Sequence, residues 1–237
     1  MSVNVALPSI TAEGGASAQA GRTDQYLDSI VVSALNRDVW SATEGSRYVA
    51  VNPTPGTGIL GHAAPTTFDE TKPYLLIYNG GSKTICPVTI RLTDTVVSVG
   101  GTRIQFTQVL DQGNRYSSGG TALVSANTNM GSSNGAGATI TAGAVLATAA
   151  SSNRRLLGNS LVKGANIDVV WDQIELVFGT TGGSTGGMLT PTTVAQWYSV
   201  PCAPVAIPPG YMWALYQWAA SQSTGPTYEV VVDYIAR

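Results

Sequence analysis

Two strand-like runs close the chain, Tyr211-Met-Trp-Ala-Leu-Tyr-Gln-Trp218 and Thr227-Tyr-Glu-Val-Val-Val-Asp-Tyr-Ile235. Aromatic and β-branched residues dominate both runs, a composition typical of β-strands. The turn signal Pro208-Pro209-Gly210 precedes the first run, because two fixed φ angles are followed by a residue that tolerates positive φ. A turn-rich segment, residues 221–226, separates the two runs. We therefore predict an antiparallel strand pair that closes a β-sheet domain.

Apolar residues occupy both faces of the first run. A half-solvated antiparallel strand carries one polar face, so this pattern predicts a strand that is covered on both sides. No helical pattern lies nearby to supply the second cover, and we interpret that cover as another subunit. The oligomer-interface candidates are Tyr211, Trp213, Leu215, Tyr216 and Trp218.

The composition is unusually poor in charge. Charged residues make up 11% of the 237 residues, against roughly 25% in ordinary soluble domains. Twelve Lys and Arg against fourteen Asp and Glu leave a net charge of −2. The absence of a basic stripe argues against direct nucleic-acid binding, and Arg154-Arg155 is interpreted as a solvated pair. No apolar run is long enough for a membrane span and no secretory signal is visible, so we expect the chain to fold in the cytoplasm.

The chain divides into an extended N-terminal arm, residues 1–22, and one β domain, residues 23–237. The arm is rich in Ala, Gly and Ser, a composition that orders only against a neighbour. Residues 24–35 fit helical spacing but contain a β-branched run, which leaves helix and strand both open. Two Gly-rich stretches, Asn127–Gly137 and Gly179–Gly187, are predicted to be mobile loops.

Short strands separated by turns fill the remainder of the domain. They are predicted at Arg47–Val51, Tyr74–Tyr78, Cys86–Leu92, Val96–Val99, Arg103–Val109, Thr121–Ser125, Thr139–Leu146, Arg155–Val162, Asp168–Phe178 and Gln196–Val200. Asn79-Gly80 predicts a tight hairpin between the second and third of these, because both residues tolerate positive φ. About ten strands with turn signals roughly every eight to twelve residues predict an all-β fold, a jelly-roll-like antiparallel β-sandwich.

Residues that carry chemistry in enzymes are few and scattered. His62 is the only histidine and has no acid nearby in the sequence to orient it, so we interpret it as structural. Together with Cys86 and Cys202 it does not form a tetrahedral metal set. Cys86 is interpreted as a small core hydrophobe, and a disulfide between the two cysteines stays open. We therefore expect no enzymatic activity, no cofactor, and no catalytic or metal-binding residues.

Two weaker patterns point to carbohydrate. A glycosidase pair could come from among the acids Asp69, Glu70, Asp94, Asp111, Asp168, Asp172 and Glu175, but their spacing selects none of them. The tryptophans at positions 40, 171, 197, 213 and 218 could line a sugar groove. We favour a core or subunit-interface role for these aromatics, with Trp213 in the core and Trp40 at a loop edge.

Three stretches resemble virion proteins of tailed bacteriophages. They are Ile207-Pro-Pro-Gly-Tyr211 with its continuation to Glu229, Asn52-Pro-Thr-Pro-Gly-Thr-Gly-Ile59, and Thr67-Phe-Asp-Glu-Thr-Lys-Pro-Tyr-Leu-Leu-Ile-Tyr-Asn79. The resemblance covers most of the chain beyond the arm, and its motifs are structural turns and strands. Size and composition are most similar to jelly-roll cement or decoration proteins, which clamp capsid joints as trimers.

That resemblance implies a structural subunit of the virion, placed on the capsid surface and assembled in the host cytoplasm. Its implied partners are further copies of itself in a homotrimer and the phage major capsid protein, with no direct contact to nucleic acid or membrane. Two alternatives stay open. One is a tail or spike component that binds host surface glycans, and the other is a glycan-acting enzyme on a β-sandwich.

Overall fold

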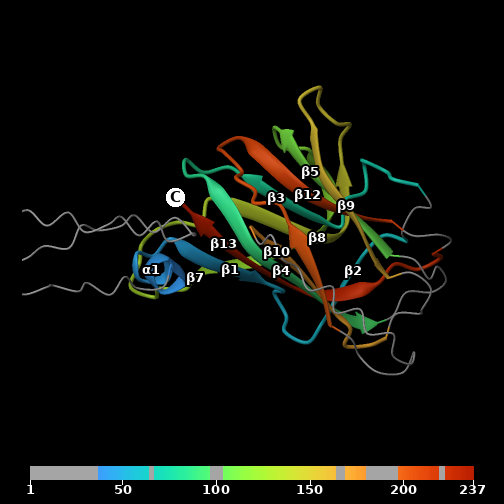
Figure 1. Cartoon of the computed structure of the whole chain (residues 1–237), viewed down its shortest axis with the longest axis horizontal. Coiled ribbons are helices and arrows are strands. Elements are labelled where there is room, and N and C mark those ends of the chain that lie inside the picture. Colours follow the sequence, from blue (N-terminus) through green and yellow to red (C-terminus); the bar gives the residue numbers. More distant parts are fainter. Residues whose placement is uncertain (1–36, 64–66, 97–103, 164–168, 180–196, 219–221) are drawn as a thin grey trace, which may run out of the picture.

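The computed structural model describes residues 37–63, 67–96, 104–163, 169–179, 197–218 and 222–237, and this part is almost entirely β-structure (Figure 1). Its elements are α1 (Arg37–Thr43), β1 (Arg47–Val51), β2 (Ile59–Leu60), β3 (Leu75–Asn79), β4 (Ile85–Val96), β5 (Ile104–Gln112), β6 (Tyr116–Ala122), β7 (Val124–Asn127), β8 (Ala138–Ala147), β9 (Arg155–Lys163), β10 (Gln173–Phe178), β11 (Trp197–Cys202), β12 (Tyr211–Trp218) and β13 (Thr227–Ala236). The predicted arm at 1–22, the ambiguous segment 24–35, Asp168, residues 97–99 and residues 180–187 lie outside the described residues.

The strands form two sheets that pack face to face (Figure 1). Sheet I has the order β11-β10-β4-β13-β1-β7, with β2 on β13, and sheet II has the order β6-β8-β3-β12-β5-β9. Eight of these strands form the sandwich proper: β1, β3, β4, β5, β9, β10, β12 and β13. When these eight are renumbered from 1 to 8 along the chain, sheet I has the order 1-8-3-6 and sheet II has the order 2-7-4-5. This is the arrangement of a jelly roll, so the predicted all-β sandwich is confirmed.

Most strand positions agree with the sequence pattern, but the strand predicted at Thr121–Ser125 spans the end of β6 and the start of β7, and the one predicted at Asp168–Phe178 begins at Gln173. Two predicted pairings are wrong. β3 and β4 do not form a hairpin, and β12 does not pair with β13, because in each case the two strands lie in different sheets. β12 pairs with β3 and β5, whereas β13 pairs with β1, β2 and β4. In a jelly roll most consecutive strands lie in different sheets, so β12 and β13 pair with strands that are distant in the sequence.

The Asn79-Gly80-Gly81 turn makes one of these crossings. Asn79 is buried, and its Nδ2 donates to the carbonyl oxygens of Lys83 at 2.7 Å and Ile207 at 2.8 Å. Its Oδ1 accepts from the backbone N–H of Gly81 at 3.1 Å. These bonds direct the chain out of sheet II and into sheet I, because a buried amide must satisfy its donors and acceptor inside the protein.

The turn before β12 forms as predicted. The N–H of Tyr211 donates to the carbonyl oxygen of Pro208 at 3.1 Å, and Gly210 has φ +80°. Pro at the second position of a β-turn and Gly with positive φ at the third are typical of a type II turn. The turn delivers Tyr211 to the start of β12, at the end of the sandwich where a cleft opens.

A β-bulge corrects the predicted burial of Cys86. The register between β4 and β13 shifts between Asp233 and Tyr234, so strict alternation does not run through the start of β4. Ile85 and Pro87 are buried, and Cys86 and Val88 are only half-buried. One extra residue in a strand moves every side chain on one side of it to the other face. Cys86 is therefore not a core residue.

The predicted mobile loop Asn127–Gly137 is held by side-chain bonds. Asn129 Nδ2 donates to the carbonyl oxygen of Thr43 at 3.0 Å, and both Asn127 and Asn134 donate to the carbonyl oxygen of Gly45 at 2.9 and 3.1 Å. These asparagines fasten the loop to the junction of α1 and β1. A glycine-rich composition alone did not reveal these contacts.

The inner faces of the two sheets meet in one core. Trp213 is fully buried and packs edge-to-face on Phe178 of the opposite sheet, with ring centroids 5.6 Å apart. In β10 the alternation predicted from sequence is confirmed, because Ile174, Leu176 and Phe178 are all buried. β12 therefore contacts sheet I through side-chain packing in the core and not through backbone pairing.

Candidate functional site

The predicted interface strand β12 is covered within the subunit. Trp213 and Leu215 are fully buried on its inner face, and Tyr216 is 1% exposed on its outer face. Tyr211 and Trp218, at the two ends, are half-buried. The prediction that both faces of this strand are covered is confirmed, but the interpretation that another subunit supplies the second cover is corrected, because residues of the same chain cover both faces.

The outer cover of β12 comes from residues 67–73. Phe68 packs edge-to-face on Tyr216 with ring centroids 5.1 Å apart, and Tyr216 Oη donates to the carbonyl oxygen of Glu70 at 3.1 Å. Burial raises the pKa of Tyr216 above its ordinary value. The sequence pattern gave no sign of this cover, because Phe68 is a lone aromatic residue outside any strand-like run.

A buried ion pair fixes this cover to sheet II. Arg115 Nη1 lies 3.1 Å from Asp111 Oδ2, with both side chains almost completely buried. Arg115 also donates to the carbonyl oxygens of Glu70 at 2.8 Å and Thr148 at 2.6 Å. Burial alone would raise the pKa of Asp111, but hydrogen bonds from Ser151 and Gln112 and the charge of Arg115 outweigh it and lower that pKa.

Two tryptophans instead lie exposed at one end of sheet I. Trp171 is 61% exposed and Trp197 is 62% exposed. Trp197 pairs with Gln173 at the start of β10, and the N–H of Trp171 donates to the carbonyl oxygen of Asp94 near the end of β4 at 2.7 Å. We call this region, formed by the exposed residues Val96, Val170, Trp171 and Trp197, the tryptophan end.

Trp171 has a backbone conformation that large side chains rarely adopt. Its φ is +77°, and it is the one non-glycine residue with positive φ among those described. Such a conformation costs on the order of 1–3 kcal/mol and is retained where the surroundings enforce it. Here the N–H of Asp94 donates to the carbonyl oxygen of Asp172 at 2.8 Å, which completes a reciprocal clamp around Trp171. The strained backbone holds an apolar ring in solvent.

A smaller apolar surface lies at the opposite end of sheet I. Trp40 and Val39 on α1 are each 48% exposed, and Trp40 Nε1 donates to Glu44 Oε1. The prediction that Trp40 is exposed and Trp213 buried is confirmed, although Trp40 lies on a helix and not at a loop edge. The core interpretation of the tryptophans therefore holds for Trp213, whereas Trp40, Trp171 and Trp197 lie at the surface.

The residues considered for chemistry take structural positions. His62 Nε2 lies 2.8 Å from the carbonyl oxygen of Val145. Glu70 pairs with Arg154, so that arginine is not simply solvated, and Asp69 pairs with Lys72. Within the described part of the chain, no group of three His, Cys, Asp or Glu side chains is placed to hold a metal ion.

Cys86 and Cys202 are not joined by a disulfide. Cys202 is buried and accepts a hydrogen bond from Gln108 Nε2 at 3.0 Å, and Cys86 is half-buried. Burial raises the pKa of the Cys202 thiol to about 11. A thiol of this kind stays protonated at neutral pH and is a poor nucleophile.

No family model, curated protein or solved structure matches this chain. Among the residues described, no helix reaches the length and apolarity that crossing a membrane requires.

Proposed function

We propose that this chain is a non-enzymatic structural subunit of a tailed-phage head, a cement or decoration protein that trimerises on the capsid surface and stabilises the shell. The observation that carries the proposal is the tryptophan end, with its two exposed indole rings. The resemblance of three sequence stretches to virion proteins, and a jelly-roll fold of a kind also used by capsid domains, support the same class.

The composition of the tryptophan end is that of an interface. Protein interfaces are enriched in aromatic residues and depleted of charged ones at their centre. Burying a large apolar side chain contributes roughly 1.5–3 kcal/mol, so the two indoles together with Val96 and Val170 would stabilise a contact by several kcal/mol. This end replaces β12 as the candidate trimer surface.

A threefold assembly requires two different surfaces on each subunit, because its contacts are heterologous. The opposite edge of sheet I supplies a suitable second surface. Val51 of β1 and Val124 of β7 lie directly opposite each other and are both exposed. We therefore assign the contact to the tryptophan end of one copy and this valine pair of the next.

The end of the molecule that carries α1 is assigned to the shell. Residues 1–22 precede α1 in the sequence. On α1 itself, Val39 and Trp40 provide exposed apolar surface. In this arrangement the major capsid protein contacts the arm and α1, while the copies contact one another through sheet I. Deleting residues 1–22 is expected to weaken attachment to heads and to leave the melting temperature of the free subunit unchanged.

Sedimentation of the purified chain at micromolar concentration tests the trimer. We expect a trimer for the wild type and a monomer for both W171A/W197A and V51S/V124S. Leu156→Ser is the matched control, because Leu156 is 57% exposed on sheet II, away from both surfaces. A monomeric wild type, or a W171A/W197A protein that stays trimeric, would refute this assembly.

Heating heads with and without the protein tests the reinforcement. A ligand that binds only the intact shell stabilises it by mass action, by about 2.7 kcal/mol at a hundredfold excess over its dissociation constant. Stripped heads should therefore release DNA at a lower temperature than decorated heads. Equal release temperatures would favour the alternative, a tail or spike component, and imaging the protein in whole particles distinguishes the two positions.

A further inference from the structure

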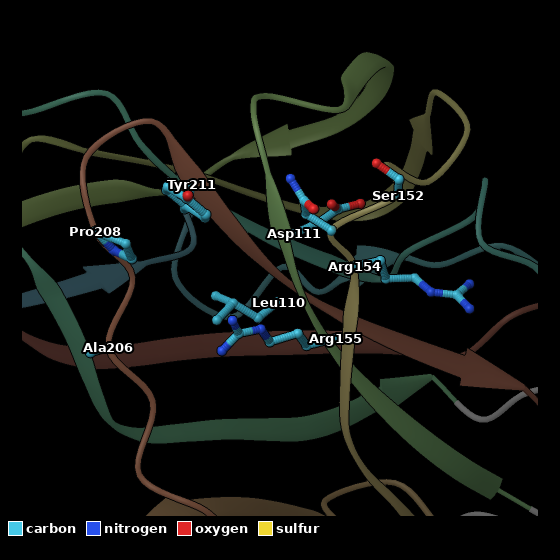
Figure 2. A pocket seen from close by; sticks show the side chains of 9 residues that line it. Leu110, Asp111, Ser152, Arg154, Arg155, Ala206, Pro208 and Tyr211 are labelled. Carbon is cyan, nitrogen blue, oxygen red and sulfur yellow. The ribbon is translucent and has the colours of Figure 1, made fainter.

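A cleft of about 680 Å³ opens at the end of the sandwich where β5, β9 and β12 meet the segment that precedes β12 (Figure 2). Its lining residues are Leu110, Asp111, Ser152, Asn153, Arg154, Arg155, Ala206, Pro208 and Tyr211. This volume lies in the range of small-molecule sites, which is roughly 300–1,000 Å³. None of these lining residues belongs to the tryptophan end or to the valine pair assigned to the contact between copies.

The two walls of the cleft differ in chemistry. Figure 2 shows Pro208 and Tyr211 on one side of the cleft and Ser152 on the other. Ala206, Pro208 and Tyr211 give apolar and aromatic lining, while Ser152, Asn153 and Arg155 give polar lining. Figure 2 shows the Arg155 side chain extending beside Leu110 on the cleft side, whereas Arg154 extends in the opposite direction.

Arg155 brings a positive charge that the cleft does not neutralise. Arg154 pairs with Glu70, and Asp111 pairs with Arg115. Among the ion pairs of the described residues, Arg155 takes part in none. The one carboxylate that lines the cleft is thus already balanced, and a ligand would meet a net positive group.

Hydrogen bonds hold both walls in place. Asn153 Nδ2 donates to Gln112 Oε1 at 2.7 Å, and the N–H of Asn153 donates to Ser151 Oγ at 3.1 Å. Ser151 in turn donates through its N–H to Asp111 at 3.1 Å. On the other wall, the turn that ends at Tyr211 is closed by its bond to Pro208. A site held by such contacts loses little entropy on binding.

We propose that this cleft binds an acidic saccharide, one that contains a uronic acid. The planar Arg155 guanidinium binds the carboxylate through paired hydrogen bonds. The apolar face of the sugar ring packs on Tyr211 and Pro208, and Ser152 and Asn153 bond its hydroxyl groups. A neutral sugar has no carboxylate to pair with Arg155, and inorganic phosphate has no apolar face to pack on Tyr211 and Pro208. The saccharide is the ligand that engages both walls.

Binding of digalacturonic acid, measured by calorimetry at low ionic strength, tests the proposal. Its neutral counterpart, α-1,4-galactobiose, isolates the contribution of the carboxylates. Because a hydrogen bond to a charged group is strong, Arg155→Ala should weaken binding about tenfold or more. Arg91→Ala, which removes the same charge from an exposed position on sheet I outside the cleft, should change the affinity less than about twofold. Tyr211→Leu should also weaken binding, and Arg155→Lys should fall between the wild type and Arg155→Ala.

Four results would overturn the proposal. They are no binding of digalacturonic acid at millimolar concentration, equal affinity for galactobiose, equal losses for the two arginine variants, and displacement by inorganic phosphate at the same concentration. An acidic peptide that binds more tightly than the saccharide would also overturn it, because the cleft would then serve a protein partner. Circular dichroism of each variant confirms that a loss of binding is not a loss of fold.

Discussion

The outer faces of the two sheets differ in how they are covered. On sheet I the outer face is polar: Arg47 Nη2 lies 2.5 Å from Asp233 Oδ2, and Glu175 lies opposite Arg91. On sheet II the outer face is apolar, with Leu76, Val109, Val145, Met212, Ala214 and Tyr216 forming a second buried cluster. The comparison teaches that an apolar outer face can be covered by the chain's own loop, so a strand with two apolar faces does not require a partner subunit.

Of the substitutions that uncover the outer face of sheet II, replacing Arg115 should lower the free energy of unfolding most. Arg115→Ala leaves Asp111 buried without its counter-charge and frees residues 67–73, so we expect a loss of about 3–5 kcal/mol in unfolding free energy. Arg237→Ala, directly after β13 of sheet I, is the control, because its ion pair with Glu44 is exposed, and it should lose about 1 kcal/mol or less. Urea denaturation of both variants measures the two losses. Equal losses would mean that the cover of sheet II does not depend on the buried pair.

Truncating Phe68 should have the next largest effect. Phe68→Ala removes the ring that packs on Tyr216, and because Phe68 is only half-buried we expect a loss of roughly 1.5 kcal/mol, the low end for a large apolar side chain. Leu156→Ala, an exposed site outside both proposed contact surfaces, should change stability by about 0.5 kcal/mol or less. Thermal unfolding followed by circular dichroism measures both. A Phe68→Ala protein as stable as the wild type would show that other residues suffice to cover Tyr216.

Acid should weaken the cover of sheet II. Because the folded protein holds the pKa of Asp111 below its ordinary value of 3.8, the unfolded chain takes up a proton at this carboxyl at higher pH than the folded protein does. The stability that this shift contributes is therefore complete well above pH 3.8 and is lost as the pH falls through the folded pKa. Unfolding midpoints of the wild type and Asp111→Asn, measured from pH 6 to pH 2.5, should converge at the acid end. Parallel curves would contradict this role of Asp111.

The smallest expected effect is on the reactivity of Cys202, which is buried between the inner faces of the two sheets. The raised pKa of Cys202, about 11 against an ordinary 9.0, leaves about a hundredfold less thiolate than an exposed cysteine carries at pH 8. Iodoacetamide should modify Cys202 slowly in the folded protein and rapidly in urea, and the Cys86→Ser variant isolates its signal. Modification at the same rate in both conditions would place Cys202 at the surface.

Local patterns were sufficient to predict the strands but not their partners. The runs at Tyr211–Trp218 and at Asp172–Phe178 were recognisable from aromatic content and two-residue alternation, and the type II turn at Gly210 from its prolines. The pairing of β12 with β3 and β5 was not, because hydrogen bonds between strands leave no mark on composition. Likewise the cleft joins Arg155 to Tyr211, which lie more than fifty residues apart in the sequence.

By itself, the sequence determined the all-β class, the positions of most strands and the burial of Trp213, because these depend on properties of neighbouring residues along the chain. Only the tertiary structure decided which sheet each strand joined, that Phe68 and Arg115 cover β12, and that Trp171 and Trp197 remain exposed. The physical reason is that a strand's two faces and two edges are satisfied by whatever the rest of the fold brings near, and in a jelly roll those partners come from distant parts of the chain.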